Sequence, residues 1–297
     1  MATSILKQSS SFASELSLKL THNILCIENP NELIEFYVNN FGMKNIEISA
    51  PSLEYNVRIL GYPTNYDENF NIASDTLPSP TFLELHYNDS SSTNSATLVN
   101  SGSSNIYWKI SITTCDVDYA QNILQSKQVN ISKPSQFEDI GYVCHLKDPN
   151  GFIIELLQHD FEETFKANMN KTSQQPLKDQ FTLGYPCCIS QITLHANDID
   201  KTKWFYQDLL CMKLLSIQDV PRYGFTLYFF AWTNENPPKS DVRDASTNRE
   251  WLWKRPYTSI EMRHFHNQRQ IPPFRDLNRM KLALKESELC AMISTRS

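Results

Sequence analysis

The sequence predicts an α+β fold built from a repeated strand–helix–strand–strand–strand module. First, residues 22–43 and 191–212 align without a gap, and each segment combines a short strand, a polar turn and a helix. Second, residues 109–129 form a fainter third copy of the same pattern. Third, each copy is followed by segments of alternating polar and apolar residues, which favour β-strands because strand side chains alternate between faces.

The two strongest copies match at apolar and aromatic positions. In the first copy, apolar residues recur at helical spacing and predict an amphipathic helix after the turn at residues 28–30. The matched pairs are Leu25 with Leu194, Phe36 with Phe205, Tyr37 with Tyr206, and Met43 with Met212.

The middle copy shows the same order of elements. Alternation at Ile110, Ile112 and Thr114 predicts a strand, and Asp116 begins the turn before an apolar helical stripe that includes Ala120. The Asp-Pro-Asn-Gly segment at 148–151 predicts a tight turn between two later strands.

These patterns divide the chain into three modules. We expect consecutive modules one and two to pair into one domain and module three to be unpaired. Its open sheet edge would then be exposed. Three arrangements are open for module three: a homodimer through this module about a two-fold axis, packing on the first pair of modules, or a partly frayed module. The predicted boundaries are a flexible tail at 1–18, modules at 19–96, 104–162 and 186–267, a linker at 163–185 and a helical tail at 268–297.

Composition excludes several classes of function. The formal net charge of −6 provides no basic surface for nucleic acid. No apolar run approaches the roughly 18 residues that would span a membrane. The seven cysteines show no CxxC spacing, which predicts reduced thiols in a cytoplasmic protein. The Ser-rich residues 1–18 lack the layout of a secretory signal, and an organelle-targeting peptide is the alternative.

Several segments carry a resemblance to a known family. "HNILCIENPNELIEFYVNNFGM" at 22–43, "LELHYN" at 83–88 and "DPNGFIIEL" at 148–156 resemble the glyoxalase I and extradiol dioxygenase superfamily, also called vicinal oxygen chelate. Module three is most similar to eukaryotic lactoylglutathione lyase. It contains "QITLHANDIDKTKWFYQDLLCMKLL", "FTLYFFAW" and "YTSIEM" in the order of that enzyme.

The resemblance implies a metal site between paired modules. In that family each module contributes one ligand from the start of its first strand and a carboxylate from its last strand. Such a mixed oxygen and nitrogen set suits Zn²⁺ or Ni²⁺, with Mn²⁺ and Fe²⁺ as alternatives. Carried over to this sequence, the implied ligands are His22 and Glu84 in module one, Glu155 in module two, and Gln191 and Glu261 in module three.

Module two departs from this pattern at its first strand. The ligand position there is Lys109, whose ammonium is a poor metal ligand near neutral pH. One alternative is a buried Lys–Glu cluster that abolishes chelation. The other is that Lys109 turns away and three ligands still hold an ion. His86, which shares a strand face with Glu84, is a substitute ligand in a third arrangement.

The resemblance also implies a reaction and its substrate. The family enzyme isomerises the hemithioacetal of methylglyoxal and glutathione. Glu155 would be the catalytic base that moves a proton between neighbouring carbons. Asn88 and Lys109 would contact the small-molecule substrate, although a turn-initiating role explains Asn88 equally well. The alternative is a catalytically inactive relative that binds a small molecule or a partner, with Lys109 in place of a metal ligand.

Overall fold

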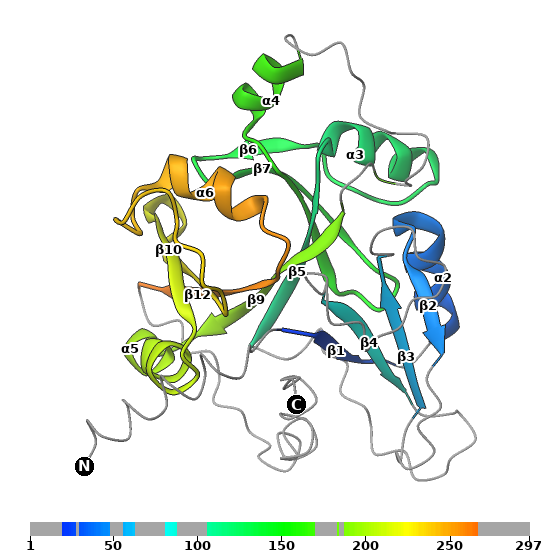
Figure 1. The fold of residues 1–297 in the computed structure, drawn as a ribbon. Helices are drawn as coiled ribbons and strands as arrows, with labels where there is room; N and C mark the ends of the chain where they lie inside the picture. Colours follow the sequence, from blue (N-terminus) through cyan, green and yellow to red (C-terminus); the bar gives the residue numbers. More distant parts are fainter. Residues whose placement is uncertain are drawn as a thin grey trace.

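The computed structural model of this chain contains two β-sheets. It describes residues 20–27, 30–47, 56–62, 81–87, 106–169, 183 and 187–266. A four-stranded sheet has the strand order β1-β4-β3-β2, and an eight-stranded sheet has the order β10-β11-β12-β9-β5-β8-β7-β6. The first sheet lies beside the curled second sheet (Figure 1). None of the described helices is long and apolar enough to cross a membrane.

Module one forms the whole four-stranded sheet. Its first and last strands pair in parallel, and the other neighbours are antiparallel. The helix ends at Gly42, whose φ of 71° is the left-handed conformation that glycine adopts readily. The elements are β1 (His22–Cys26), α2 (Pro30–Phe41), β2 (Lys44–Glu47), β3 (Asn56–Gly61) and β4 (Phe82–Tyr87).

Module two forms one half of the larger sheet. Asp116 caps its helix by accepting a hydrogen bond from the Tyr119 amide at 2.9 Å, where the sequence predicts the turn. The turn at 148–151 joins two antiparallel strands, with Gly151 at a φ of 85°. The elements are β5 (Tyr107–Thr114), α3 (Val117–Ser126), β6 (Ser135–Phe137), β7 (Gly141–Lys147), β8 (Ile153–Gln158) and α4 (Glu162–Met169).

Module three forms the other half. Its helical segment starts as α5 and continues as a π-helix at Trp204–Leu209. An additional helix, α6, connects its last two strands and packs against β10. The elements are β9 (Cys188–Ala196), α5 (Ile199–Lys203), β10 (Lys213–Val220), β11 (Phe225–Ala231), α6 (Ala245–Trp253) and β12 (Ser259–Phe265).

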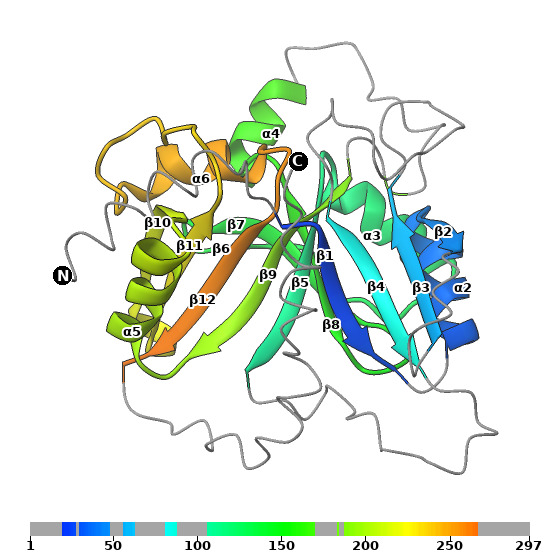
Figure 2. The ribbon, with the colours of Figure 1, turned by 60° about the horizontal axis from the view of Figure 1, so that its bottom comes forward.

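The predicted α+β fold of repeated modules is confirmed, but the predicted pairing is wrong. Modules two and three are paired, because β5 runs antiparallel to β9 with Ile110 opposite Ile192. Module one forms a separate sheet beside them (Figure 2). Its apolar residues Leu33, Tyr37 and Phe41 share one core with residues of module two, so packing, not strand pairing, joins these two modules.

This arrangement changes the expectation of a homodimer. The edge of β9 that would have been open in an unpaired module is occupied by β5. Two copies therefore cannot pair β9 with β9 around Gln191 while this sheet is intact. The predicted two-fold contact through module three is corrected to a contact within one chain, between modules two and three.

Candidate functional site

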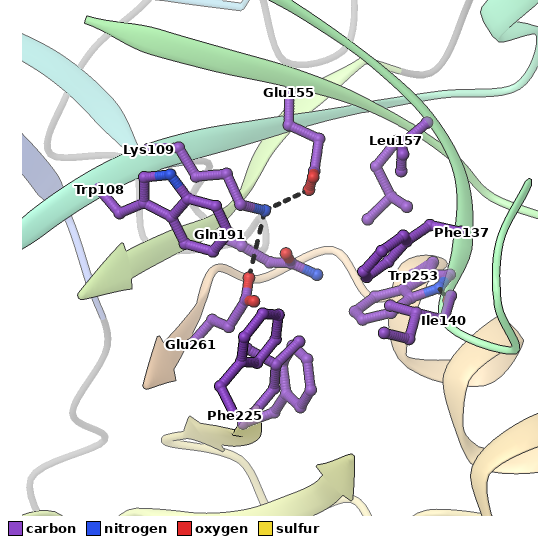
Figure 3. A pocket seen from close by; sticks show the side chains of 13 residues that line it. Trp108, Lys109, Phe137, Ile140, Glu155, Leu157, Gln191, Phe225, Trp253 and Glu261 are labelled. Atoms are coloured by element: carbon purple, nitrogen blue, oxygen red, sulfur yellow. Dashed lines mark hydrogen bonds and ion pairs between the residues drawn. The ribbon is translucent and has the colours of Figure 1, made fainter. Parts of the chain in front are cut away.

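A small cavity lies on the face of the eight-stranded sheet where modules two and three meet (Figure 3). Its volume is about 40 Å³. One part of its lining is polar and comes from Lys109, Glu155, Gln191 and Glu261. The remaining walls are aromatic or aliphatic and come from Trp108, Phe137, Ile140, Val143, Leu157, Phe225, Leu227, Phe229 and Trp253.

The strand register explains why four polar residues from distant segments converge. Each module pairs its first strand in parallel with its last, which places Glu155 beside Ser111 and Glu261 beside Thr193. The hydroxyl groups of these neighbours donate to the carboxylates, at 2.7 Å from Ser111 and 2.8 Å from Thr193. The β5–β9 pairing then brings the two module halves together.

Lys109 lies between the two carboxylates. Its Nζ is 2.5 Å from Oε1 of Glu155 and 3.5 Å from Oε2 of Glu261. The second oxygen of Glu155 is 2.9 Å from Nε2 of His145. Of the arrangements that the sequence left open for Lys109, the structure contains the buried Lys–Glu cluster.

The two carboxylates respond differently to this environment. Burial acts to raise the pKa of Glu155, but the Lys109 ammonium and His145 outweigh it and hold that pKa well below its usual range. Burial raises the pKa of Glu261, and the more distant Lys109 only partly opposes it. Burial acts to lower the pKa of Lys109, but the two carboxylates raise it overall. Glu155 is therefore the ionised partner of Lys109, and Glu261 is the carboxyl group that takes up a proton more readily.

This cavity does not fit the divalent metal that the resemblance implies. An ammonium has no lone pair to give, and Lys109 already occupies the position between the two carboxyl groups that would hold a cation. In the part of the chain that the structure describes, no group of three or more His, Cys, Asp or Glu residues is arranged to hold a metal ion. Glu155, Gln191 and Glu261 are brought together as a polar cluster around Lys109.

Gln191 faces the cavity with an unused donor. The residue is only 2% exposed. Within the described ranges, its Nε2 has no hydrogen-bond partner. A buried amide without a partner costs free energy of about 1–3 kcal/mol, so this N–H is available to a molecule that enters the cavity.

The structure separates the module-one residues from this cavity. His22 and Glu84 lie on β1 and β4 of the other sheet, with Nε2 of His22 4.0 Å from Oε2 of Glu84. His86 Nε2 is 2.5 Å from the other oxygen of Glu84. Burial lowers the pKa of His22, which favours the neutral imidazole. The predicted Asn88 lies outside the described residues.

Sequence reasoning did not select two residues beside the cavity, Trp108 and Arg263. The guanidinium carbon of Arg263 is 3.5 Å from the centroid of the Trp108 ring. Arg263 follows Glu261 by two positions on β12, and strand alternation places both on one face, but alternation alone assigns Arg263 no role. Trp108 lies where the β5–β9 register shifts between Tyr107 and Lys109, an irregularity with no signal in the sequence.

Comparisons with known proteins show which proteins the chain is similar to. No protein-family model matches it. The chain is 23% identical over 237 residues to glyoxalase I of Saccharomyces cerevisiae, covering 77% of this chain and 67% of the relative. It is 24% identical over 220 residues to a lactoylglutathione lyase of Arabidopsis thaliana, covering 73% of this chain and 63% of the relative.

Solved structures agree on the fold. Glyoxalase I of Zea mays superimposes with a TM-score of 0.56 at 18% identity, over 86% of this chain and 71% of that one. A variant of the same enzyme gives a TM-score of 0.58 at 17% identity, over 88% and 73%. By its repeated modules, its fold and these sequence relatives, the chain is similar to proteins of the glyoxalase I and vicinal oxygen chelate superfamily.

Proposed function

We propose that the cavity between modules two and three binds a small organic molecule without a metal and does not isomerise hemithioacetals. The observation that carries this proposal is the position of Lys109 between Glu155 and Glu261. A buried ammonium supplies the positive charge that a metal ion would supply, and removing either partner leaves an uncompensated buried charge.

The environment of Glu155 argues against a role as the general base that would take a proton from carbon. A general base works best when its pKa lies near the operating pH. Glu155 instead has a lowered pKa and contacts Lys109, Ser111 and His145, all of which favour the carboxylate. Its oxygens are occupied, so it is poorly placed to take a proton from carbon.

Metal analysis of the purified chain tests this proposal. We expect that mutation of Glu155 or Glu261 to Ala does not change the content of Zn or Ni after incubation and dialysis. We expect K109H to gain metal relative to the unaltered chain, because an imidazole then joins two carboxylates and Gln191. Stoichiometric metal in the unaltered chain that is lost in E155A, together with turnover of the hemithioacetal, would contradict the proposal.

A second candidate function is lactoylglutathione lyase activity at His22 and Glu84. The observation that favours it is an imidazole and a carboxylate on one sheet face with no lysine between them. These two residues would hold Zn²⁺ or Ni²⁺, or else Mn²⁺ or Fe²⁺, and further ligands would come from outside the described residues. The substrate would be the glutathione adduct of methylglyoxal.

Paired variants separate the two candidates. If the second function operates, H22A and E84A lose both bound metal and hemithioacetal turnover, while E155A and E261A keep them. Equal turnover and equal metal content in H22A and the unaltered chain would exclude it.

A further inference from the structure

We propose that Arg263 binds the carboxylate of the molecule that occupies the cavity, so that the natural ligands are small organic acids. This inference rests on the proposed metal-free binding function and names its ligand class. Three observations lead to it: the position of Arg263, its lack of an ion pair among the described residues and the donors that remain for a ligand.

Arg263 lies beside the cavity, against two of the aromatic side chains that line it. It is two residues beyond Glu261 on the same strand, and therefore on the same face and about 7 Å further along. Its guanidinium carbon is 3.5 Å from the ring centroid of Trp108 and 5.5 Å from that of Phe225. Both rings line the cavity, so the guanidinium borders the cavity's aromatic wall.

The guanidinium of Arg263 forms no ion pair among the described residues, although the carboxyl group of Glu261, two positions away on β12, acts to raise its pKa. No carboxylate there lies within 4.0 Å of its guanidinium nitrogens. Burial lowers the pKa of Arg263 to about 10, which still leaves it cationic at neutral pH. A half-buried cation without an ion pair is unfavourable, and an anionic ligand would compensate it.

Most donors of Arg263 remain unused. Its only side-chain hydrogen-bond partner among the described residues is His195, with Nε and one Nη each 3.1 Å from a ring nitrogen. Burial and the nearby Arg263 lower the pKa of His195 to about 4, so the ring is neutral and has a single acceptor nitrogen. At most one of the two contacts is an N–H···N bond. Because a guanidinium has five N–H donors, four remain.

The geometry favours a carboxylate with an apolar body. Trp108 holds one face of the guanidinium and leaves its edge to form the two parallel hydrogen bonds that a carboxylate accepts. Lys109 does not compete for this group, since Glu155 and Glu261 already neutralise it. The aromatic walls suit the apolar part of the ligand, and the unused Nε2–H of Gln191 offers a second polar contact.

A matched pair of probes tests the inference. Propanoate and propanamide have nearly the same shape, differ in charge and are small, as a cavity of about 40 Å³ requires. Binding is measured by titration calorimetry and by the fluorescence of tryptophan, since Trp108 and Trp253 line the cavity. We expect the acid to bind about 10- to 100-fold more tightly than the amide, with an advantage that falls as salt rises.

Substitutions assign the preference to Arg263. In R263Q the acid should bind no more tightly than the amide, while amide binding is unchanged. R263K keeps the charge but loses the two-pronged contact, so part of the preference remains and the fold is retained. The control is R243Q, because Arg243 pairs with Asp219 on the exposed surface. It should bind both probes as the unaltered chain does.

Each other outcome has a defined meaning. Equal binding of acid and amide by the unaltered chain, or an acid preference that survives R263Q, would overturn the role of Arg263 and leave metal-free binding in place. Binding of neither probe would contradict the proposed function as well. Tighter binding of ethyl phosphate than of the acid would replace the carboxylate by a phosphate as the ligand class.

Discussion

The first strands of modules one and two differ in the residue that lies next to the glutamate of the last strand. Both modules place a glutamate on the last strand, next to the first strand. At the equivalent position of the first strand, module one has His22 and module two has Lys109. Glu155 is thus compensated by an ammonium within the chain, whereas Glu84 contacts the imidazoles of His22 and His86. The residue at this position of the first strand therefore decides the outcome. Lys109 occupies the space between the carboxyl groups of the cavity, whereas His22 leaves the face around Glu84 able to attract a cation.

We expect the largest loss of stability from the removal of the Lys109 ammonium. Lys109→Met leaves two carboxyl groups buried without a cation, which we expect to lower the free energy of unfolding by about 3–5 kcal/mol. Urea denaturation at neutral pH measures the loss. In the matched control, Lys166→Met removes an exposed i,i+4 pair with Glu162 and should cause no measurable change. If the Lys109 variant is as stable as the unaltered chain, the cluster does not neutralise the cavity.

Replacing all three ionisable residues of the cluster tests whether the loss in K109M comes from uncompensated charge. The triple variant K109M, E155Q, E261Q removes the cation and both anions together. We expect it to recover a large part of the stability lost in K109M alone, because no uncompensated charge remains. Failure to recover would mean that K109M is destabilised by lost packing.

The two glutamates of the cavity should differ in their effect. Glu155 is held as a carboxylate by Lys109, whereas the pKa of Glu261 is raised. Glu155→Gln should therefore cost about 2–3 kcal/mol and Glu261→Gln less than about 1 kcal/mol at neutral pH, measured by urea denaturation. If Glu261→Gln instead costs more stability than Glu155→Gln, the main ion-pair partner of Lys109 is Glu261.

The repeated module was predictable because its signals are local. Alternation, helical spacing and turn residues such as Asp116 and Gly151 report on a few neighbouring positions, and the structure has the corresponding elements. The position of Lys109 at the start of a first strand also followed from counting along aligned copies. These features need no knowledge of distant contacts.

Module pairing and the contact beside the cavity were not predictable in the same way. Pairing of β5 with β9 depends on which faces pack, and α2 of module one packs onto module two instead of extending its sheet. Trp108 meets Arg263 across the irregular register of β5 and β9. Local patterns contain no information about such contacts between segments that lie far apart in the sequence.

The last predicted effect concerns the contact that joins modules one and two. Tyr37 of α2 donates a hydrogen bond to Asp148 of module two at 3.1 Å. Burial raises the pKa of Asp148 to about 6, although its backbone donors and Tyr37 oppose the shift. Because this folded-state pKa exceeds the unfolded value of about 3.9, the stability contribution of Asp148 is fully present below pH 4 and is lost as the pH rises through 6.

Asp148→Asn should remove this dependence on pH. Relative to the unaltered chain, we expect its free energy of unfolding to improve by about 1–2 kcal/mol between pH 4 and pH 7, because asparagine carries no charge to bury. Urea denaturation of both proteins across this range measures the difference. Asp116→Asn, at a helix cap outside this contact, is the control and should show a smaller change. If the difference in free energy of unfolding between D148N and the unaltered chain instead stays constant with pH, Asp148 is ionised at no cost. The junction of modules one and two would then be better solvated than its burial indicates.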